Sequence, residues 1–186
     1  MAVAPSLQTR WTKRRLQVEL ATSIDGISSS RRLRYRAFAE ELGADVKRAA
    51  PGIDEDAFDP YCQHRLVKDA GAGDVIGSTR LLPDSQAAKA GSFYSAGEFD
   101  ITPLLAMPGR RLEAGRTCID PRYRQGAAIA VLWSGLADDI KDNRVDMLFG
   151  CAGIEMHDGG TQIQTQAIMN RVRNTRRCRW LSGSHP

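Results

Sequence analysis

Apolar and polar positions follow one another along the chain in a way that predicts five strands and three helices. Alternation predicts strands over residues 15–21, 64–68, 74–82 and 111–119, and a short apolar run predicts another over 145–151. Apolar residues spaced three and four apart predict helices over 31–42, 127–141 and 164–177, with Ser30 capping the first and Gly43 ending it. The turn between the second and third strands predicts an antiparallel hairpin, and residues 84–109 form a long excursion. This order predicts an α/β or α+β fold, with helices on the faces of a sheet.

The length of 186 residues fits a single domain. We expect a loose polar arm over residues 1–13 and one domain over 14–186. With 42% apolar and 26% charged residues, the composition is that of a soluble globular protein. The sequence contains no run of 18 apolar residues, and its N-terminus lacks the apolar stretch of a secretory signal, so we expect a cytoplasmic protein.

Cysteine and histidine are too scattered to predict a disulfide framework or a metal site. The three histidines are not clustered, and no two cysteines have CxxC spacing. We therefore expect no metal and free thiols at Cys62, Cys118, Cys151 and Cys178.

The formal net charge is +4, and its distribution is more informative than its value. Basic residues cluster over 10–15, 31–36 and 171–179. Such clusters attract a nucleic acid, an anionic membrane surface or an acidic carrier protein, unless they are solvated helix faces. We expect no nucleic-acid partner, because the basic residues lack interleaved aromatics and no recognition motif is present.

The segment DPRYRQGAAIAVLW, residues 120–133, joins the fourth strand to the second helix. Its small-residue turn exposes helix N–H groups that suit an anionic ligand, such as a pyrophosphate or a phosphopantetheine phosphate. Arg122 and Arg124 would add charge-assisted hydrogen bonds. The alternative is an ordinary strand-to-helix turn without a ligand. One face of the helix is predicted to carry Ile129, Leu132, Trp133, Leu136 and Ile140.

Several motifs, taken in order, carry a resemblance to a known family. They are RYRAF (34–38), ELGAD (41–45), DAFD (56–59), HRLV (64–67), DVIGSTRLLP (74–83), LEAGRTCIDPRYRQGAAIAVLW (112–133) and LFGCA (148–152). Together they resemble the acyl-carrier-protein-dependent branch of the GNAT N-acyltransferases. This branch includes ornithine-lipid N-acyltransferases, N-acyl amino acid synthases and, further off, acyl-homoserine-lactone synthases. The resemblance implies a GNAT-like acyl-CoA N-acyltransferase fold, with a central mixed twisted sheet flanked by helices. Such a core continues through two more strands, so we expect the C-terminal strands to be missing after about residue 170.

The resemblance implies two binding regions. Asp56 and Asp59 match an acidic pair near the amine acceptor, where a carboxylate could hold the ammonium group or help to remove its proton. The alternatives are a solvated acidic turn for this pair and a core position for Phe38. The acyl-donor residues implied are Arg34 and Phe38 on one helix face, with Arg122, Arg124, Gly126, Ala127 and Ala128 in the turn.

Arg80, Glu113 and Arg116 match the family's catalytic positions. A buried arginine needs a partner, because an unpaired buried charge is costly. Residues three apart on a strand face opposite sides, so Glu113 and Arg116 would not pair unless a bulge intervenes. We therefore expect Arg80 to pair with Glu113 on the neighbouring strand, and Glu113 to be the best candidate for the general base.

The implied chemistry needs few side chains. An amine attacks a thioester carbonyl, backbone N–H groups stabilise the oxyanion, and a base takes the ammonium proton. In GNAT folds the thioester arm lies in a gap between two parallel strands, here 111–119 and 145–151. No resident cofactor and no covalent enzyme intermediate are expected, since the acyl-phosphopantetheine thioester of acyl carrier protein, or of CoA, is a co-substrate.

The predicted function is therefore transfer of a fatty (3-hydroxy)acyl group from acyl carrier protein to an amino acid, with ornithine as the first candidate. The carrier protein is the expected partner, and an anionic membrane surface is a second one, which would make the enzyme peripheral at the inner membrane face. Arg124 stands two residues before Gly126, the shorter turn of this branch, which argues against a simple acetyl-CoA enzyme. The alternatives are an acyl-homoserine-lactone-type signal synthase, disfavoured because Ala44 stands where such enzymes have Trp, or a truncated inactive module that only binds acyl carrier protein.

Overall fold

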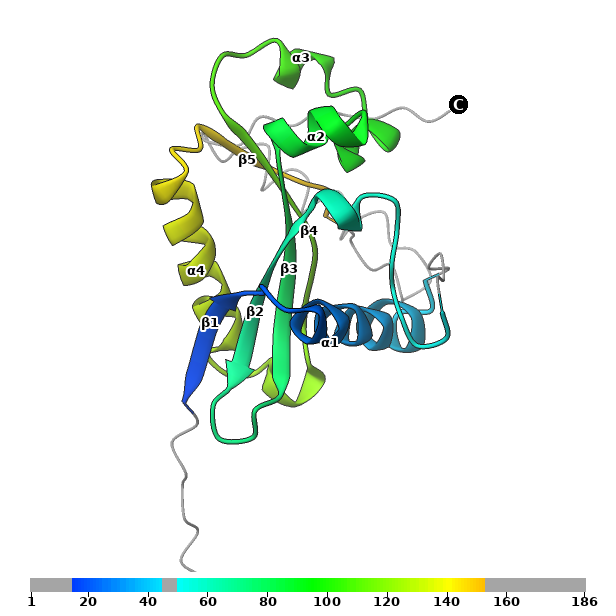
Figure 1. The fold of residues 1–186 in the computed structure, drawn as a ribbon, viewed down its shortest axis with the longest axis vertical. Helices are drawn as coiled ribbons and strands as arrows, with labels where there is room; N and C mark the ends of the chain where they lie inside the picture. Colours follow the sequence, from blue (N-terminus) through cyan, green and yellow to red (C-terminus); the bar gives the residue numbers. More distant parts are fainter. Residues whose placement is uncertain (1–14, 45–49, 153–186) are drawn as a thin grey trace, which may run out of the picture.

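The computed structural model describes residues 15–44 and 50–152, which form a mixed sheet with helices on both faces (Figure 1). In this part of the chain the strands lie side by side in sequence order: β1 (Leu16–Leu20), β2 (Gln63–Asp69), β3 (Val75–Pro83), β4 (Arg111–Ile119) and β5 (Met147–Phe149). The first four are antiparallel neighbours, and β5 pairs with β4 in parallel. All five predicted strands and the β2–β3 hairpin are confirmed.

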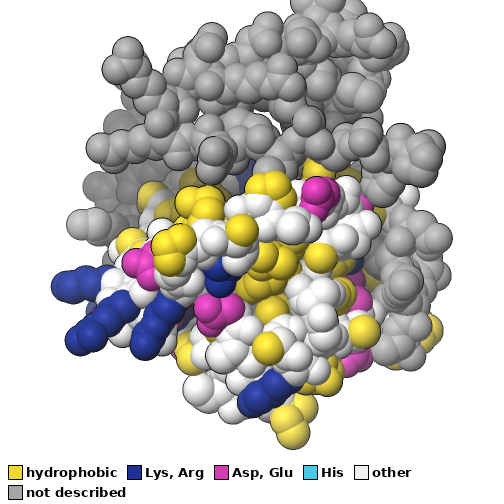
Figure 2. All heavy atoms as spheres, turned by 90° about the horizontal axis from the view of Figure 1, so that it is seen from above, with side chains coloured by type: hydrophobic (Ala, Val, Ile, Leu, Met, Phe, Trp, Pro, Cys, Tyr) yellow, Lys and Arg dark blue, Asp and Glu magenta, His cyan; other side chains and the backbone are white. Residues whose placement is uncertain are grey.

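Two helices sandwich the sheet. α1 (Ile24–Tyr35) continues into a π-helical turn, η1 (Arg36–Glu41), and lies across one face, while α4 (Ala128–Asp142) lies along the other (Figure 1). α2 (Asp84–Ala90) and α3 (Thr102–Leu105) lie at the end of the sheet where β3 ends and β4 begins, which is the end that Figure 2 views from above. Short 3₁₀ turns are η2 (Asp59–Tyr61), η3 (Tyr94–Gly97) and η4 (Pro121–Tyr123).

The first helix begins earlier than the sequence pattern predicted. Its N-cap is Ser23, whose Oγ accepts a hydrogen bond of 3.1 Å from the N–H of Gly26, so the predicted cap at Ser30 is wrong. The residues before Ser30 gave no helical signal, because the segment DGISSS (25–30) is rich in Gly and Ser, which favour turns. The structure buries Gly26 and Ser30 against the sheet instead, and tertiary packing overrides the local preference.

Residues 84–109 are more regular than predicted. They contain α2, η3 and α3, and Ala87, Phe93 and Ile101 pack with Leu82 of β3 in one buried cluster. α2 and α3 are too short for a periodic apolar pattern to reveal them.

Two irregular pairings decide which side chains face each helix. In β3 the register slips next to Val67 and Lys68 of β2, and in β4 it slips opposite Ser78 and Arg80. Beyond the first slip, alternate residues of β3 face the two helices: Ser78 contacts α1 through Ser30, and Leu81 packs against α4 through Leu136. We call these two sides of the sheet the α1 face and the α4 face.

The predicted apolar face of α4 is correct in part. Leu132 and Leu136 are buried against the sheet, but Ile129 and Trp133 are 39% and 50% exposed. Trp133 therefore extends beside the sheet, and the buried stripe is completed by Ala128, Gly135 and Asp139.

Several predictions lie outside the described residues: the arm over 1–13, the helix over 164–177, the end of the domain near residue 170, and the first and third basic clusters. None of the described helices is long and apolar enough to cross a membrane.

Candidate active site

A cleft opens where β4 and β5 separate. The two strands pair only from Arg111 with Met147 to Glu113 with Phe149. The next residue of the chain, Gly150, approaches β4 so closely that a Cβ there would overlap the carbonyl oxygen of Ala114. Beyond this point β5 has ended while β4 continues. A cleft of about 790 Å³ lies between β4 and the chain at residues 148–152, where β5 ends. The parallel pairing predicted for these two strands is confirmed.

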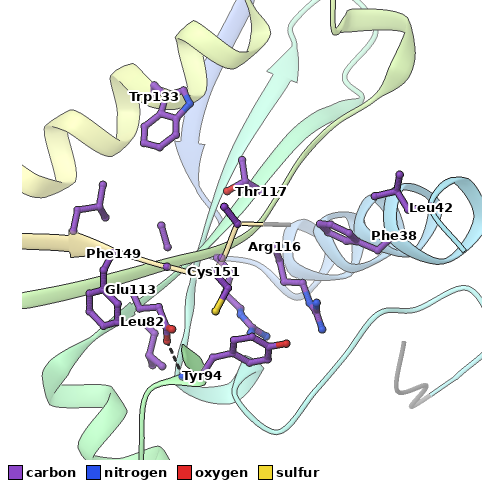
Figure 3. Close-up of a pocket in the computed structure, with 16 residues that line it drawn as sticks. Phe38, Leu42, Leu82, Tyr94, Glu113, Arg116, Thr117, Trp133, Phe149 and Cys151 are labelled. Carbon is purple, nitrogen blue, oxygen red and sulfur yellow. Dashed lines mark hydrogen bonds between the residues drawn. The ribbon is translucent and has the colours of Figure 1, made fainter. Parts of the chain in front are cut away.

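The cleft has a different lining on the two sides of β4. Trp133 of α4 and Thr117 lie on one side in Figure 3, and Glu113, Arg116 and Tyr94 lie on the other. The cleft therefore reaches both faces of the sheet. Further lining comes from Phe38 and Leu42 near the end of α1, and from Leu82, Leu148, Phe149 and Cys151.

A β-bulge turns Arg116 toward the α1 face. Ser78 pairs with Cys118, but Arg80 pairs with Gly115, so β4 has one residue more than β3 between these pairs. Arg116 adopts the left-handed conformation with φ 52°, which is uncommon for a residue other than Gly, Asn or Asp. On a regular strand, Glu113 and Arg116 would face opposite sides of the sheet. The bulge places both of them on the α1 face.

Arg80 and Glu113 do not form the predicted ion pair. Glu113 lies opposite Leu82 in the register, and Arg80 instead donates from Nη1 to Asp56 Oδ1 at 2.6 Å. The prediction was wrong because it assumed neighbouring positions on regular strands. Asp56 lies in the segment between α1 and β2, whose approach to β3 is a tertiary contact that strand alternation cannot show.

Glu113 holds the segment at η3 in place. Its carboxylate accepts hydrogen bonds from the N–H groups of Tyr94 at 2.8 Å and Ser95 at 2.6 Å, and from Ser95 Oγ (Figure 3). The side chain is 4% exposed, and both of its oxygens are used. This carboxylate therefore stabilises the start of η3, where unpaired N–H groups favour a negative charge.

Arg34 forms the centre of a buried ionic cluster beneath the cleft. It is 0% exposed, donates from Nε to Asp54 at 3.0 Å, and donates through both Nη atoms to Asp59 at 2.6 and 3.2 Å. Burial alone would raise the pKa of Asp59, but the hydrogen bonds and charge of Arg34 outweigh it and hold that pKa below its ordinary value. Neither Arg34 nor Asp59 is among the residues that line the cleft.

His64 completes the cluster on the side of β2. Its Nδ1 lies 3.2 Å from Ser30 Oγ, which lies 2.6 Å from Ser78 Oγ, and its Nε2 lies 3.5 Å from Asp59. Burial lowers the pKa of His64 to about 4, despite the neighbouring carboxylate, so the imidazole is neutral near pH 7. His64, Ser30 and Ser78 therefore connect α1 to the sheet by hydrogen bonds between neutral groups.

Asp56 and Arg116 are less completely paired than the rest of the cluster. Asp56 Oδ1 accepts from the N–H of Phe58 and from Arg80, but Oδ2 has no hydrogen-bond partner among the described residues. Arg116 Nε likewise has none there; it lies 3.5 Å from Asp54, and Nη2 lies 3.8 Å from Asp56 Oδ2.

Tyr94 is a site residue that the sequence pattern did not reveal. Its ring makes an edge contact with Phe58 at 5.7 Å, and the guanidinium carbons of Arg80 and Arg116 lie 5.7 and 5.6 Å from its centroid. Burial raises the pKa of Tyr94. The segment SFYSAGEF offered no periodicity, and only the Glu113 contact places it beside β4.

The turn before α4 is internally paired. Arg122 forms hydrogen bonds with Asp120, and Arg124 with Glu41 and with the carbonyl of Ile119. Ala127 precedes α4 without a side-chain cap, and none of the described residues lining the cleft comes from this turn. Binding of a donor phosphate by Arg122, Arg124, Gly126, Ala127 and Ala128 stays a prediction.

The described cysteines are not activated thiols. Burial raises the pKa of Cys62 and of Cys118 to about 12, and it also raises that of Cys151, which lies 3.3 Å from Ser95 Oγ at the cleft. No group of three or more His, Cys, Asp or Glu side chains in the described ranges could hold a metal ion.

A mixed sheet between helices, with two parallel strands that separate around a cleft, is the arrangement expected of a GNAT acyltransferase. Residues 33–134 match the family described as the acetyltransferase (GNAT) domain. The chain belongs to this family, and the predicted GNAT fold is confirmed.

Curated proteins also match the chain in sequence over most of its length. The chain is 39% identical over 153 residues to L-ornithine N(alpha)-acyltransferase of Rhodobacter capsulatus, covering 76% of this chain and 58% of that protein. It is 39% identical over 146 residues to the protein of the same name from Brucella abortus, covering 74% and 52%. The chain spans about half the length of the curated relatives it matches.

Solved structures resemble the fold at low sequence identity. FeeM, an N-acyl amino acid synthase from uncultured soil microbes, has a TM-score of 0.53 at 15% identity, over 73% of this chain and 70% of that one. The AHL synthase LasI has a TM-score of 0.57 at 17% identity, over 86% and 78%.

Proposed function

We propose that the chain is an N-acyltransferase that moves a fatty (3-hydroxy)acyl group from acyl carrier protein to the α-amine of an amino acid, with ornithine as the first candidate. The observation that carries this proposal is the cleft between β4 and β5. Its α1 side ends at Arg116, and behind Arg116 lies an ionic cluster in which Asp56 Oδ2 has no hydrogen-bond partner among the described residues. The names of the relatives, which share 38–39% identity, support the acceptor.

The cleft suits a thioester arm with an acyl chain. Its volume of about 790 Å³ is ample for such a ligand, since small-molecule pockets measure about 300–1,000 Å³. Phe38, Leu82, Trp133 and Phe149 give it apolar walls. The edge of β4 beyond Glu113 has no strand paired to it on the cleft side among the described residues, so its N–H groups are candidates for the oxyanion contact.

Two carboxylates compete for the role of general base. Glu113 was the first candidate, but three donors already occupy its two oxygens. Asp56 does not line the cleft itself, but its Oδ2 has no hydrogen-bond partner among the described residues and lies 3.8 Å from Nη2 of Arg116, which does line it. These contacts favour Asp56 as the group that takes the ammonium proton, and Glu113 as the residue that positions Tyr94.

The carrier protein is the proposed partner because it is acidic and the chain is basic. Arg32 and Arg36 are exposed on the side of α1, and Arg122 is exposed at the turn before α4. Hydrogen bonds from Arg122, helped by the charge of Arg36, hold the pKa of Asp120 below its ordinary value, so the two arginines act on one region. Such a patch would speed encounter with an acidic carrier. A carrier-protein donor also implies a cytoplasmic enzyme, peripheral at the inner membrane face if its product enters a lipid.

The test is to incubate the full chain with 3-hydroxyacyl carrier protein and a mixture of amino acids, and to identify products by mass spectrometry. An acyl-ornithine peak is the expected result. An acyl-homoserine lactone formed from a supplied S-adenosylmethionine would make the chain a signal synthase instead. No product from a sample that unfolds cooperatively would favour the module that only binds the carrier.

Matched variants then identify the base. Asp56→Asn is expected to lower kcat by about 100-fold or more, the usual contribution of a general base. Glu113→Gln is expected to retain the pH dependence of kcat/KM while raising KM, because it loosens η3. If Glu113→Gln instead abolishes turnover while the affinity for ornithine and the melting temperature stay unchanged, Glu113 is the base.

A further inference from the structure

Arg116 stands apart from the other arginines of the ionic cluster. Arg34 and Arg80 each donate short hydrogen bonds to aspartates, and their side chains are 0% and 5% exposed. The side chain of Arg116 is 25% exposed and lines the cleft, and its nearest carboxylate oxygens lie at 3.5 and 3.8 Å, beyond hydrogen-bond distance.

The position of this guanidinium is nevertheless fixed. Its carbon lies 5.6 Å from the ring centroids of both Phe38 and Tyr94, and Figure 3 shows these three side chains converging from β4, the end of α1 and η3. The backbone beneath it is held in the left-handed conformation by the bulge. Uncommon conformations of this kind persist where surrounding structure enforces them, and they gather at ligand sites.

Asp56 presents the complementary feature beside it. Its Oδ2 is buried and has no hydrogen-bond partner among the described residues, and it lies 3.8 Å from Arg116 Nη2. A buried acceptor left without a hydrogen bond is costly, so a ligand that donates to it is favoured. An acceptor without a hydrogen bond, buried just behind the cleft, therefore lies beside a cation that lines the cleft and makes no short hydrogen bond to a carboxylate.

Charge balance in the cluster narrows the chemistry of that ligand. Three arginines (Arg34, Arg80, Arg116) face three aspartates (Asp54, Asp56, Asp59), and burial keeps His64 neutral. The carboxylate of Glu113, on the same face, is satisfied separately by hydrogen bonds from the start of η3. An isolated anion or an isolated cation would leave a net charge in a poorly solvated place. A group that carries both charges on adjacent atoms would satisfy both partners and leave the balance unchanged.

We infer that Arg116 binds the carboxylate of the acceptor and Asp56 Oδ2 its α-ammonium, so that the enzyme requires a free α-amino acid. The inference rests on the proposed function, which it extends to the group that selects the acceptor. An α-amino acid carries both charged groups on one carbon, which matches two protein groups a few ångströms apart. A guanidinium binds a carboxylate through two parallel hydrogen bonds, and the two aromatic rings orient it for this geometry.

The reaction then follows with all protons accounted for. Asp56 takes one proton from the ammonium, and the neutral amine attacks the thioester carbonyl carbon. The C–S bond breaks as the amide forms, and the second proton lost from nitrogen goes to the departing thiolate. Arg116 takes no proton in this sequence; it holds the acceptor carboxylate so that the nitrogen faces the cleft.

The test compares three acceptors with the full chain: ornithine, ornithine amide, in which the carboxylate is neutralised, and putrescine, in which it is absent. Wild type is expected to prefer ornithine by about 100-fold or more in kcat/KM, because a site built for a polar group rejects an analogue without it. Arg116→Gln should lose that factor with ornithine, mainly through KM, and leave ornithine amide nearly unchanged. Arg116→Lys should recover part of the preference, since it keeps the positive charge but cannot form the two parallel hydrogen bonds of a guanidinium.

A matched control is available in the chain. Arg144 is also an arginine in the left-handed conformation, with φ 51°, and it is exposed before β5, outside the cleft lining. Arg144→Gln should retain the full preference for ornithine. Equal losses with ornithine and ornithine amide in Arg116→Gln would overturn the inference.

Direct binding separates this inference from the proposed function. Calorimetry with ornithine and ornithine amide, without a donor, should show tighter binding of ornithine to wild type and equal, weak binding to Arg116→Gln. If ornithine binds in this manner but no acyl-amino acid forms with any donor, the proposed transfer fails while the carboxylate site stands. If products form but both ligands bind alike to wild type, the carboxylate site fails alone.

Discussion

The two faces of this sheet are held to their helices by different physics. On the α4 face, Val67, Ile76, Ile119 and Leu132 form a buried hydrocarbon cluster. On the α1 face, Leu33 and Ala37 pack beside a layer of buried polar and charged side chains: Ser30, Arg34, Asp54, Asp59, His64, Ser78 and Arg80. His64, Ser78 and Arg80 reach the α1 face by alternation along the strands. The remaining polar groups come from α1 and from the segment between α1 and β2, so the two faces also differ in what packs against them.

Because of this difference, we expect the α4 face to contribute mainly to the stability of the fold and the α1 face mainly to selectivity for the acceptor. Hydrocarbon contacts are roughly additive in buried area and tolerate substitution of similar volume. Buried ion pairs gain little net free energy, because the desolvation cost offsets the attraction, but loss of one partner is severe. The α4 face therefore supplies stability, and the hydrogen bonds and ion pairs of the α1 face hold Arg116 at the cleft and Asp56 just behind it.

The largest effect is expected from Arg34→Leu. It leaves the Asp54 and Asp59 carboxylates buried without their cation, and loss of one partner of such a cluster costs about 3–5 kcal/mol. Urea unfolding measures the loss. Lys68→Leu is the control, because Lys68 pairs with Glu19 at 2.6 Å near the surface, where the side chains are 33% and 44% exposed and such pairs contribute about 1 kcal/mol or less.

Equal losses in the two variants would contradict the comparison, since they would show that the ionic layer is no more demanding than a pair near the surface. A triple replacement of Arg34, Asp54 and Asp59 by apolar residues would sharpen it. That protein is expected to recover much of the stability and to lose the orientation of Asp56 and Arg116, and with it the preference for ornithine.

Leu132→Ala tests the α4 face. Leu132 is 2% exposed against Val67 and Ile119, and removal of a buried leucine side chain costs about 3–4 kcal/mol, within the usual range for such cavities. Below the lowered melting temperature, KM for ornithine should stay within about twofold of wild type, because the cavity lies across the sheet from Asp56. A loss of acceptor selectivity in this variant would mean that the two faces are coupled.

Acidification should weaken the α1 face selectively through His64. Its pKa is lowered to about 4 in the folded protein, so between pH 6.5 and 4 the unfolded chain binds a proton that the folded chain does not. Stability therefore falls as pH drops through this window, by up to about 3 kcal/mol, and this contribution is constant below it. The lowered pKa of Asp59 adds its loss only below the ordinary range of an aspartate.

Unfolding by urea at pH 7, 5.5 and 4.5 measures this slope. His64→Gln removes the titrating group while keeping a polar side chain, so its stability should depend less on pH in the same window. If wild type and variant lose stability in parallel, the acid sensitivity comes from other groups and His64 is not the one that titrates.

The two faces also differ in how far the sequence could predict them. Alternation placed four strands and a short apolar run placed the fifth. Leu132 and Leu136 of α4 were found because hydrophobic periodicity is a local signal. On the α1 face, the family resemblance identified Arg34, Asp59, Arg80 and Glu113 as a set, but it did not show their partners. The Arg80–Asp56 pair depends on the path of the segment between α1 and β2. Arg116 faces α1 only because of the bulge in β4.

The contacts of Glu113 show the same limit. A carboxylate on a central strand is a reasonable candidate for a base, and nothing in the local sequence indicates that Tyr94 and Ser95 will approach it from the excursion after β3. Short elements such as η3 are positioned by the tertiary contacts they make. Which carboxylate remains free to react is therefore a property of the assembled site.

The smallest expected effect concerns the start of α1, the helix that carries Ser30 and Arg34. Ser23→Ala removes the hydrogen bond from Gly26 N to Ser23 Oγ, and loss of such an N-cap costs about 1 kcal/mol. Thr22→Ala, at the exposed residue just before the cap, should change stability by less than about 0.5 kcal/mol. The cap orients the whole ionic layer, so Ser23→Ala should also raise KM for ornithine slightly. If stability changes equally and negligibly in both variants, the helix starts nearer Ser30, the cap first expected. If Ser23→Ala loses more stability while KM is unchanged, capping stabilises α1 without directing the site.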